Sequence, residues 1–317
     1  MTAVEITFLG TGSGAPSRAR NVSATALHLP QRGEWWLIDC GEGTQHQILR
    51  ASHIRLSQLT RIFLTHLHGD HLFGLPGLLA SRALAQGGVG PVTIYGPEGV
   101  EAWLKATLRA AGMRFGFPVN VVTVKPGVIC TDGEFTVMAA PVRHRIEAYG
   151  YAIREAEQTG RFEVEAAAAL GIPPGPLYGQ LKAGKSVTLA DGRVIEGASL
   201  VGPTRPGRYI VFSGDTSPAP ELVLMAQGAD LLVHEATYSE QDRSLADRAA
   251  HATATIAAEA ARDAGVHALL LTHFSARYEG GESEVNLETL LAEARAIFPE
   301  TRLAHDLLRV SVPRREQ

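Results

Sequence analysis

The sequence predicts an α/β or α+β domain built from layers of strands and helices. Short apolar runs typical of buried strands alternate with segments that begin at proline or end at glycine, as helices do. Histidines and acidic residues recur directly after several of the apolar runs. One segment, residues 154–207, breaks this alternation. We therefore expect a single domain over residues 1–317 that carries an inserted arm at 154–207.

In the first half of the chain, apolar runs rich in β-branched and aromatic residues are bounded by glycine, asparagine and proline. These runs predict strands at 4–9, 25–29, 35–38, 62–64, 92–95, 119–124 and 134–140. The glycines and proline of residues 10–21 predict a loop between the first two strands. A short helix is expected at about 45–51, and Pro76 and Pro97 suit the first turns of two further helices.

The second half repeats the pattern of strands that end in polar residues. Helices are expected at about 246–264, ended by Gly265, and at about 285–297. The apolar runs predict strands at 209–212, 230–233, 267–272 and 307–312. The alternation continues that of the first half, so the two halves are expected to belong to one layered domain.

The inserted segment differs from the rest in composition. Its stretch GIPPGPLYGQLKAGKS, residues 171–186, contains three prolines, four glycines, two lysines and no acidic residue. Such a stretch is not expected to build a core of its own, which predicts a protruding arm. A disordered insertion and an anion-binding arm are the two alternatives for its state.

Length, composition and charge favour an ordinary globular enzyme. A chain of 317 residues can bury a large core without disulfides, and 45% hydrophobic and 20% charged residues are usual for this class. The two cysteines form no CxxC pair, so nothing indicates an oxidising compartment. A net charge of −4 gives no global sign of a nucleic-acid partner. Without a signal peptide or a long apolar run, we expect a cytoplasmic protein that has no membrane partner.

Residues 61–80 carry the densest group of candidate metal ligands. His66, His68, Asp70 and His71 lie within six positions, directly after an expected buried strand. Because side chains alternate in an extended loop, His66 and His68 point the same way. Imidazole and carboxylate donors that converge on a small volume suit zinc best. A solvated polar loop is the alternative interpretation.

Further candidate ligands come from neighbouring strand ends. His144, Asp215 and His273 each follow an expected strand, and Glu235 has the same placing as a candidate acid. Residues at neighbouring strand ends meet at one rim of a sheet, where loops carry function. Two metals could be held if Asp215 bridges them. The complete expected ligand set is His66, His68, Asp70, His71, His144, Asp215 and His273.

The HLHGDH run at 66–71, followed by a lone histidine, a GDT aspartate and a TH histidine, resembles the metallo-β-lactamase superfamily. That resemblance implies an αββα sandwich with a binuclear zinc centre between its sheets. Smaller motifs resemble the ribonuclease Z family, the tRNA 3′-processing endoribonucleases, along nearly the whole chain. They are a PxKxRN-like loop at 16–21 with Arg18 in place of lysine, HEAT at 234–237, an HST-like HAT at 251–253, the arm tip at 171–185, and HFSARY from His273.

The resemblance also implies roles for the metal ligands and for two further residues. One zinc would be held by His66, His68 and His144, the second by Asp70, His71 and His273, with Asp215 shared. Asp70 would also orient the attacking water or accept its proton. His251, assisted by Glu235, would protonate the leaving ribose 3′-oxygen. A histidine on the surface of an Ala/Thr-rich helix is the alternative for His251.

For the substrate, the resemblance implies contacts at two places. Arg18, Arg20 and Asn21 would meet the RNA near the cleavage point, since arginine forks suit phosphate. The arm would grip the tRNA body across a homodimer through Lys182 and Lys185. Arg277 would border the substrate cleft.

The expected function is removal of the 3′ trailer of precursor tRNA by metal-activated hydroxide. Cleavage after the discriminator nucleotide would leave a tRNA 3′-hydroxyl and a trailer 5′-phosphate, and a side 3′-exonuclease activity is compatible with the site. No nucleotide cofactor is expected. The rivals are a small-molecule phosphodiesterase, another hydrolase of this fold acting on thioesters or lactones, and a metal-stabilised RNA-binding module without turnover.

Overall fold

The computed structural model describes residues 4–85, 90–279 and 285–315 of the chain. It divides into two compact units. Unit 1 comprises residues 1–154 and 209–313, and unit 2 comprises residues 155–208 and 314–317.

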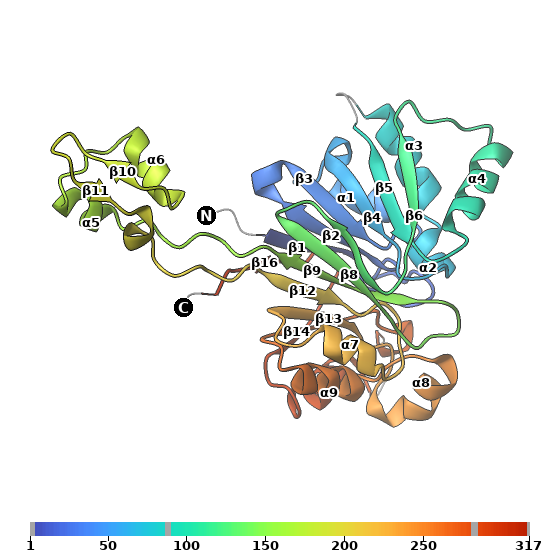
Figure 1. Ribbon diagram of the computed structural model, residues 1–317. Coiled ribbons are helices and arrows are strands. Elements are labelled where there is room, and N and C mark those ends of the chain that lie inside the picture. Colours follow the sequence, from blue (N-terminus) through green and yellow to red (C-terminus); the bar gives the residue numbers. More distant parts are fainter. Residues whose placement is uncertain (1–3, 86–89, 280–284, 316–317) are drawn as a thin grey trace. The chain divides into compact units, whose positions relative to one another are not determined.

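Within the described residues, unit 1 contains two seven-stranded sheets, ordered β16-β1-β2-β3-β4-β5-β6 and β15-β14-β13-β12-β9-β8-β7 (Figure 1). The strands of the first sheet are β1 Val4–Gly10, β2 Ala24–Leu29, β3 Glu34–Ile38, β4 Leu59–Phe63, β5 Val92–Gly96, β6 Val119–Thr123 and β16 Arg309–Val312. Those of the second are β7 Gly127–Thr131, β8 Phe135–Pro141, β9 Tyr149–Glu155, β12 Tyr209–Phe212, β13 Leu231–Glu235, β14 Leu269–Thr272 and β15 Thr301–Leu303.

Helices cover the outer face of each sheet in unit 1 (Figure 1). Those beside the first sheet are α1 Thr44–Arg50, α2 Gly69–Leu72, α3 Leu75–Leu84 and α4 Val100–Ala110. Those that follow strands of the second are α7 Pro220–Met225, α8 Arg243–Ala249, α9 Ala254–Ala264 and α10 Leu287–Arg295. An apolar core between the sheets includes Trp36, Phe63 and Tyr151. These layers confirm the αββα sandwich.

Parallel pairing brings the functional strand ends to one edge of each sheet. In the first sheet β3, β4 and β5 run parallel, and in the second β12, β13 and β14 do. The carboxyl ends of parallel strands lie at a common edge, so the loops that follow them meet. Here the two sheets are also joined directly. The Tyr151 hydroxyl donates to the Leu64 carbonyl oxygen at 2.6 Å, and the Tyr149 amide donates to the Thr65 carbonyl oxygen at 2.9 Å.

Unit 2 has a small core of its own. It contains α5 Val164–Ala169, α6 Pro176–Lys182 and a hairpin of β10 Val187–Thr188 and β11 Val194–Ile195. Six buried apolar residues pack together in it: Ala167, Ile172, Leu181, Val187, Ile195 and Leu200. The stretch 171–186 contributes Ile172 and Leu181 to this core and shares it with residues on either side. The core draws residues from both sides of the Gly/Pro-rich stretch, which the composition of that stretch alone does not reveal.

The helix expected at 246–264 is two helices. Ala250 adopts a left-handed conformation with φ of 56° and ends α8. The Thr253 hydroxyl oxygen then accepts the Ile256 amide at 3.2 Å, a side-chain cap that begins α9. His251 therefore lies in the break between two helices and not on a helix surface. Strands β7, β9 and β15 were also absent from the expected elements, because their pattern is short or irregular.

In the described part of the chain, no helix has the length and apolar character that a membrane crossing requires.

Candidate active site

The predicted ligands of unit 1 come together at the edge where the two sheets meet. His66 and His68 follow β4, and Asp70 and His71 lie on α2. His144 follows β8, Asp215 follows β12 and His273 follows β14. They form two groups whose possible ligand atoms lie within 4.8 Å of one another: His66, His68 and His144, and Asp70, His71, Asp215 and His273.

The first group consists of three imidazoles. The Nδ1 atom of His68 lies 3.0 Å from Nε2 of His66 and 3.1 Å from Nε2 of His144. Nε2 of His66 also lies 3.6 Å from Oδ2 of Asp215, which belongs to the second group. Asp215 therefore borders both groups, as a bridging ligand must.

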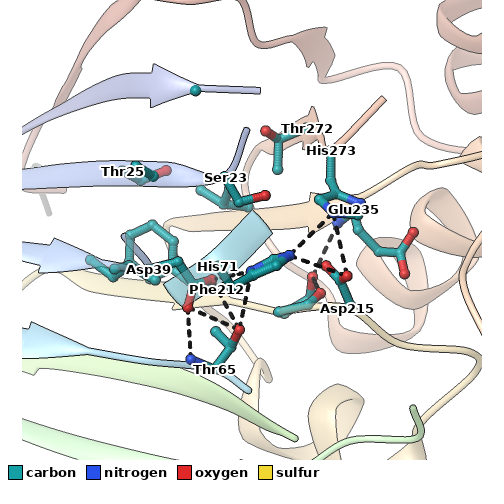
Figure 2. A pocket seen from close by; sticks show the side chains of 16 residues that line it. Ser23, Thr25, Asp39, Thr65, His71, Phe212, Asp215, Glu235, Thr272 and His273 are labelled. Atoms are coloured by element: carbon teal, nitrogen blue, oxygen red, sulfur yellow. Dashed lines mark hydrogen bonds and ion pairs between the residues drawn. The ribbon is translucent and has the colours of Figure 1, made fainter. Parts of the chain in front are cut away.

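The second group combines two imidazoles with two carboxylates. Nε2 of His71 lies 3.2 Å from Nε2 of His273, and both nitrogens lie 3.3 Å from Oδ2 of Asp215. Oδ2 of Asp70 lies 3.3 Å from the nitrogen of His273 and 3.5 Å from that of His71. Figure 2 shows His71, Asp215 and His273 converging from different elements.

These separations fit a tetrahedral cation. Ligand atoms that each lie about 2.0–2.1 Å from one zinc ion in tetrahedral geometry are about 3.3–3.4 Å apart. The spacings described within the two groups, 3.0–3.5 Å, lie near that length. The donor set of imidazole nitrogens and carboxylate oxygens is also the one that zinc accepts. The residues present therefore fit divalent cation binding.

Hydrogen bonds on the far side of the rings fix their orientation. Nδ1 of His71 donates to Oδ2 of Asp39 at 2.8 Å, and Nδ1 of His144 donates to the carbonyl oxygen of Ala250 at 2.8 Å. Because these partners only accept, each neutral ring carries its lone pair on Nε2, toward the ligand group. Nδ1 of His273 lies 2.9 Å from the Thr237 hydroxyl oxygen.

Burial and charge act in opposite directions at the centre. Burial lowers the pKa of His66 to about 2, which keeps its ring neutral and able to bind a cation. Burial also lowers the pKa of His71, but the carboxylates of Asp215 and Asp39 outweigh it and raise that pKa well above its ordinary value. The clustered carboxylates thus favour a positive charge at His71. A cation bound there would take the place of that proton.

Glu235 and His251 form a pair beside the second group. Nδ1 of His251 lies 2.8 Å from Oε1 of Glu235, and 3.9 Å from Oδ2 of Asp215. Glu235 is 1% exposed and also accepts the Thr216 amide and the Thr237 hydroxyl. Burial lowers the pKa of His251, yet the Glu235 carboxylate outweighs it and raises that pKa to about 9. The carboxylate of Glu235 thus favours the charged form of the His251 ring.

The loop expected to meet the substrate is tied to the ligand cluster. The Gly14 amide donates to Oδ2 of Asp70 at 2.8 Å. Arg18 is exposed, whereas Arg20 is 8% exposed and its Nη1 donates to Thr11 at 2.6 Å and to the Ala304 carbonyl oxygen at 2.9 Å. The buried guanidinium of Arg20 therefore holds the loop in place, and its contact with the substrate stays a prediction. The Asn21 amide group donates to the Glu42 carbonyl oxygen at 2.9 Å, which is likewise an anchoring contact.

The remaining predicted substrate residues lie in two places. Arg277 is exposed, forms an ion pair with Asp242 at 3.4 Å and lies over the ring of Tyr238 at 5.3 Å. Lys182 and Lys185 are exposed residues of unit 2, at and just beyond the end of α6.

Three residues with clear positions in the site were missed. Asp39 directly follows β3, so the rule applied to other strand ends would have found it. Thr65 precedes His66, and its hydroxyl lies 3.0 Å from Nδ1 of that ring. Arg145 lines the cavity in front of the ligands, together with Ser13, His144 and Tyr238. No spacing in the sequence marked Arg145.

Comparison with known proteins identifies the family. Residues 34–165 and 190–274 match the family described as "Beta-lactamase superfamily domain". Ribonuclease Z of Gloeothece citriformis (strain PCC 7424) is 55% identical over 311 residues, which cover 98% of this chain and 97% of that protein. Ribonuclease Z of Synechocystis sp. (strain ATCC 27184 / PCC 6803 / Kazusa) is 56% identical over 313 residues, 98% of this chain and 95% of that protein.

Solved structures agree with this family. The short form of human tRNase Z is 30% identical, with a TM-score of 0.67 over 98% of this chain and 99% of that one. A diphosphatase from the PhnP family has a TM-score of 0.62 at 19% identity, over 98% of this chain and 97% of that one, which shows the shared fold alone. The near full-length identity to ribonucleases Z is more specific than the fold. This chain therefore belongs to the ribonuclease Z family of metallo-β-lactamase-fold hydrolases.

Proposed function

We propose that this chain removes the 3′ trailer of precursor tRNA, with two zinc ions bound by the seven clustered ligands. Cleavage after the discriminator nucleotide leaves a 3′-hydroxyl on the tRNA and a 5′-phosphate on the trailer. The observation that carries the proposal is the Glu235–His251 pair, 2.8 Å apart, beside two adjoining ligand groups. A cation site alone serves many hydrolases, whereas this pair adds a proton donor for a poor leaving group.

When bound, the two cations offset the phosphate charge and lower the pKa of the attacking water. The first group, His66, His68 and His144, would hold one cation. The second group, Asp70, His71 and His273, would hold the other, with Asp215 between them. Asp70 already accepts the Gly14 amide through Oδ2, which fixes its carboxylate where it can orient the water and accept its proton.

His251 supplies the proton that the leaving ribose 3′-oxygen requires. Its Nδ1 proton is held by Oε1 of Glu235, so the second proton of the charged ring lies on Nε2. A buried Glu235 keeps its negative charge beside His251 through hydrogen bonds from Thr216 and Thr237. This arrangement stabilises the charged ring before the reaction and fixes its orientation.

Unit 2 is proposed to bind the tRNA body in a homodimer. Lys182 and Lys185 lie near one another in sequence on its exposed surface and can contact phosphates. On a chain whose net charge is −4, such contacts must come from local groups of this kind.

The test is to incubate the zinc-loaded protein with a 3′-extended tRNA and map both product ends. We expect a single cut after the discriminator nucleotide, close to two zinc ions per chain by metal analysis, and no cleavage by His68→Ala. A chain that trims the trailer one nucleotide at a time would indicate exonuclease action. Hydrolysis of small phosphodiesters or thioesters without any cleavage of tRNA would support the rival hydrolases, and RNA binding without turnover would support a binding module.

A further inference from the structure

A cavity of about 290 Å³ opens in front of the ligand cluster in unit 1. Its lining includes ligands and His251. It also includes Ser13, Arg145, Tyr238 and Ala249, none of which belongs to the ligand set. A phosphodiester bound at the ligands from this cavity lies beside these residues, so they are candidates for contacts next to the scissile bond.

Among the described residues that line this cavity, Arg145 is the only arginine or lysine. It directly follows the ligand His144, on the loop between β8 and β9, and is exposed. Its Nη2 donates to the carbonyl oxygen of Arg248 at 3.0 Å, which fixes the guanidinium at the rim. Within the residues that the structure describes, no carboxylate forms an ion pair with Arg145, in contrast to Arg20 and Arg277.

The anchor of Arg145 places it on the His251 side of the cavity. Arg248 and Ala249 are the last two residues of α8, just before the break that contains His251, and Ala249 lines the cavity itself. The rings of His144 and His251 are 4.9 Å apart, centroid to centroid. Because His251 protonates the leaving oxygen in the proposed function, this side receives the RNA that precedes the cut.

We propose that Arg145 binds the phosphate on the 5′ side of the discriminator nucleotide, one phosphate upstream of the scissile bond. This inference rests on the proposed function, since it uses the direction in which His251 orients the RNA. A guanidinium held through one nitrogen keeps its other N–H groups for a phosphate, and the fork geometry suits two phosphate oxygens. A phosphate contact does not distinguish one base from another, so it would position the RNA at the cleavage site without selecting its sequence.

Arg145→Gln tests the contact, and Arg143→Gln is the matched control. Arg143 is exposed on the same loop, two residues earlier, and does not line the cavity. On precursor tRNA we expect Arg145→Gln to lower kcat/KM about tenfold, as expected for loss of one charge-assisted hydrogen bond. Arg143→Gln should remain at the wild-type value. Zinc content should be unchanged in both variants.

The position of the contact is tested by removing one charge from the substrate. A short precursor with a methylphosphonate in place of the phosphate 5′ of the discriminator nucleotide should be cut more slowly by the wild-type protein. The Arg145→Gln protein should cut this modified precursor no more slowly than it cuts the unmodified one. When the methylphosphonate lies at another phosphate, it should slow the variant and the wild type by the same factor. The inference would be overturned if the methylphosphonate at the proposed position slowed Arg145→Gln as much as it slows the wild type. It would also be overturned if Arg145→Gln and Arg143→Gln lowered kcat/KM equally. Absence of tRNA cleavage by the wild type would instead defeat the proposed function.

Discussion

Asp39 shows how a residue outside the ligand set can decide the behaviour of a ligand. Its backbone has φ of 59°, a left-handed conformation that aspartate and asparagine tolerate better than most residues. From this position Oδ2 accepts Nδ1 of His71, and Oδ1 accepts the Thr65 amide at 2.7 Å (Figure 2). One carboxylate therefore orients a ligand ring and fixes the loop that carries His66.

Asp39→Asn should weaken metal binding while keeping the fold. Asparagine suits the left-handed backbone, so the substitution mainly removes the negative charge beside His71. Loss of such a partner weakens metal affinity by about ten- to hundredfold. Titration of the zinc-loaded protein with a chelator measures the affinity. An unchanged affinity would show that the Asp39 carboxylate does not support the ligand, and circular dichroism checks that the fold is intact.

Glu235→Gln should lower the rate of cleavage and leave metal content unchanged. The amide cannot stabilise the charged His251 ring as the carboxylate does, so the pKa of His251 should fall and the proton donor should be lost at neutral pH. We expect kcat on precursor tRNA to fall by about 10²-fold, the lower range for a general acid. Zinc analysis of the same sample separates this effect from loss of the cations. A wild-type kcat would remove His251 from the mechanism.

At the scale of elements, β2 carries a histidine that the site does not use. His28 is 9% exposed, and its ring lies 5.0 Å from that of His53, centroid to centroid. In the described residues its Nε2 has no hydrogen-bond partner. Burial, together with the neighbouring His53, lowers the pKa of His28 to about 4. His28 therefore stays neutral in the folded chain at pH values, below about 6.5, at which it binds a proton in the unfolded chain.

This difference makes unit 1 sensitive to acid. Because the folded pKa of His28 is the lower one, the protein loses stability as pH falls from about 6.5 to about 4, and the loss then levels off. His28→Gln should reduce the loss between pH 7.5 and pH 4.5 by about 2 kcal/mol, allowing for the exposed part of the ring. Urea unfolding at the two pH values measures it.

A control separates His28 from general acid effects. His267→Gln, at an exposed position, should lose as much stability in acid as the wild type. Protonation of the ligand cluster affects all three proteins equally and cancels in the comparison. Parallel pH dependences for wild type and His28→Gln would contradict the assignment.

At the scale of the whole molecule, the roles of the two units can be tested separately. Unit 1 holds the ligand cluster, and unit 2 has a separate core that a deletion of 171–186 would destroy through Ile172 and Leu181. Charge variants are therefore the better probe of unit 2. They change its exposed surface and leave its packing in place.

Lys182→Gln and Lys185→Gln should weaken precursor tRNA processing through KM. Each lost phosphate contact should reduce the slope of log affinity against log salt by about 0.7–0.9. Lys125→Gln, an exposed lysine of unit 1, serves as the control and should leave both KM and slope unchanged. Kinetics and binding at several salt concentrations measure the effects. Identical slopes for all three variants would show that unit 2 does not bind through these lysines.

The sequence determined the alternation of strands and helices, the ligand-rich loop after β4 and the placing of Asp215, Glu235 and His273 at strand ends. These features follow from local periodicity and from the rule that functional loops follow strands. Both can be read from a single segment of the chain, without knowing what packs against it. The motifs at 66–71 and 234–237 further indicated the family, because they combine residue types whose chemistry is specific.

Tertiary structure alone decided which side chains turn inward. Arg18 and Arg20 are two positions apart in one loop, yet the second is buried because Thr11 and the Ala304 carbonyl oxygen accept its guanidinium. The break at Ala250 frees His251 to reach Glu235, and the Arg248 carbonyl oxygen at the end of α8 holds Arg145 at the cavity. The contacts of Arg20 with Ala304 and of Arg145 with Arg248 join residues far apart in the chain. Their geometry depends on how the sheets and helices pack, which no local pattern encodes.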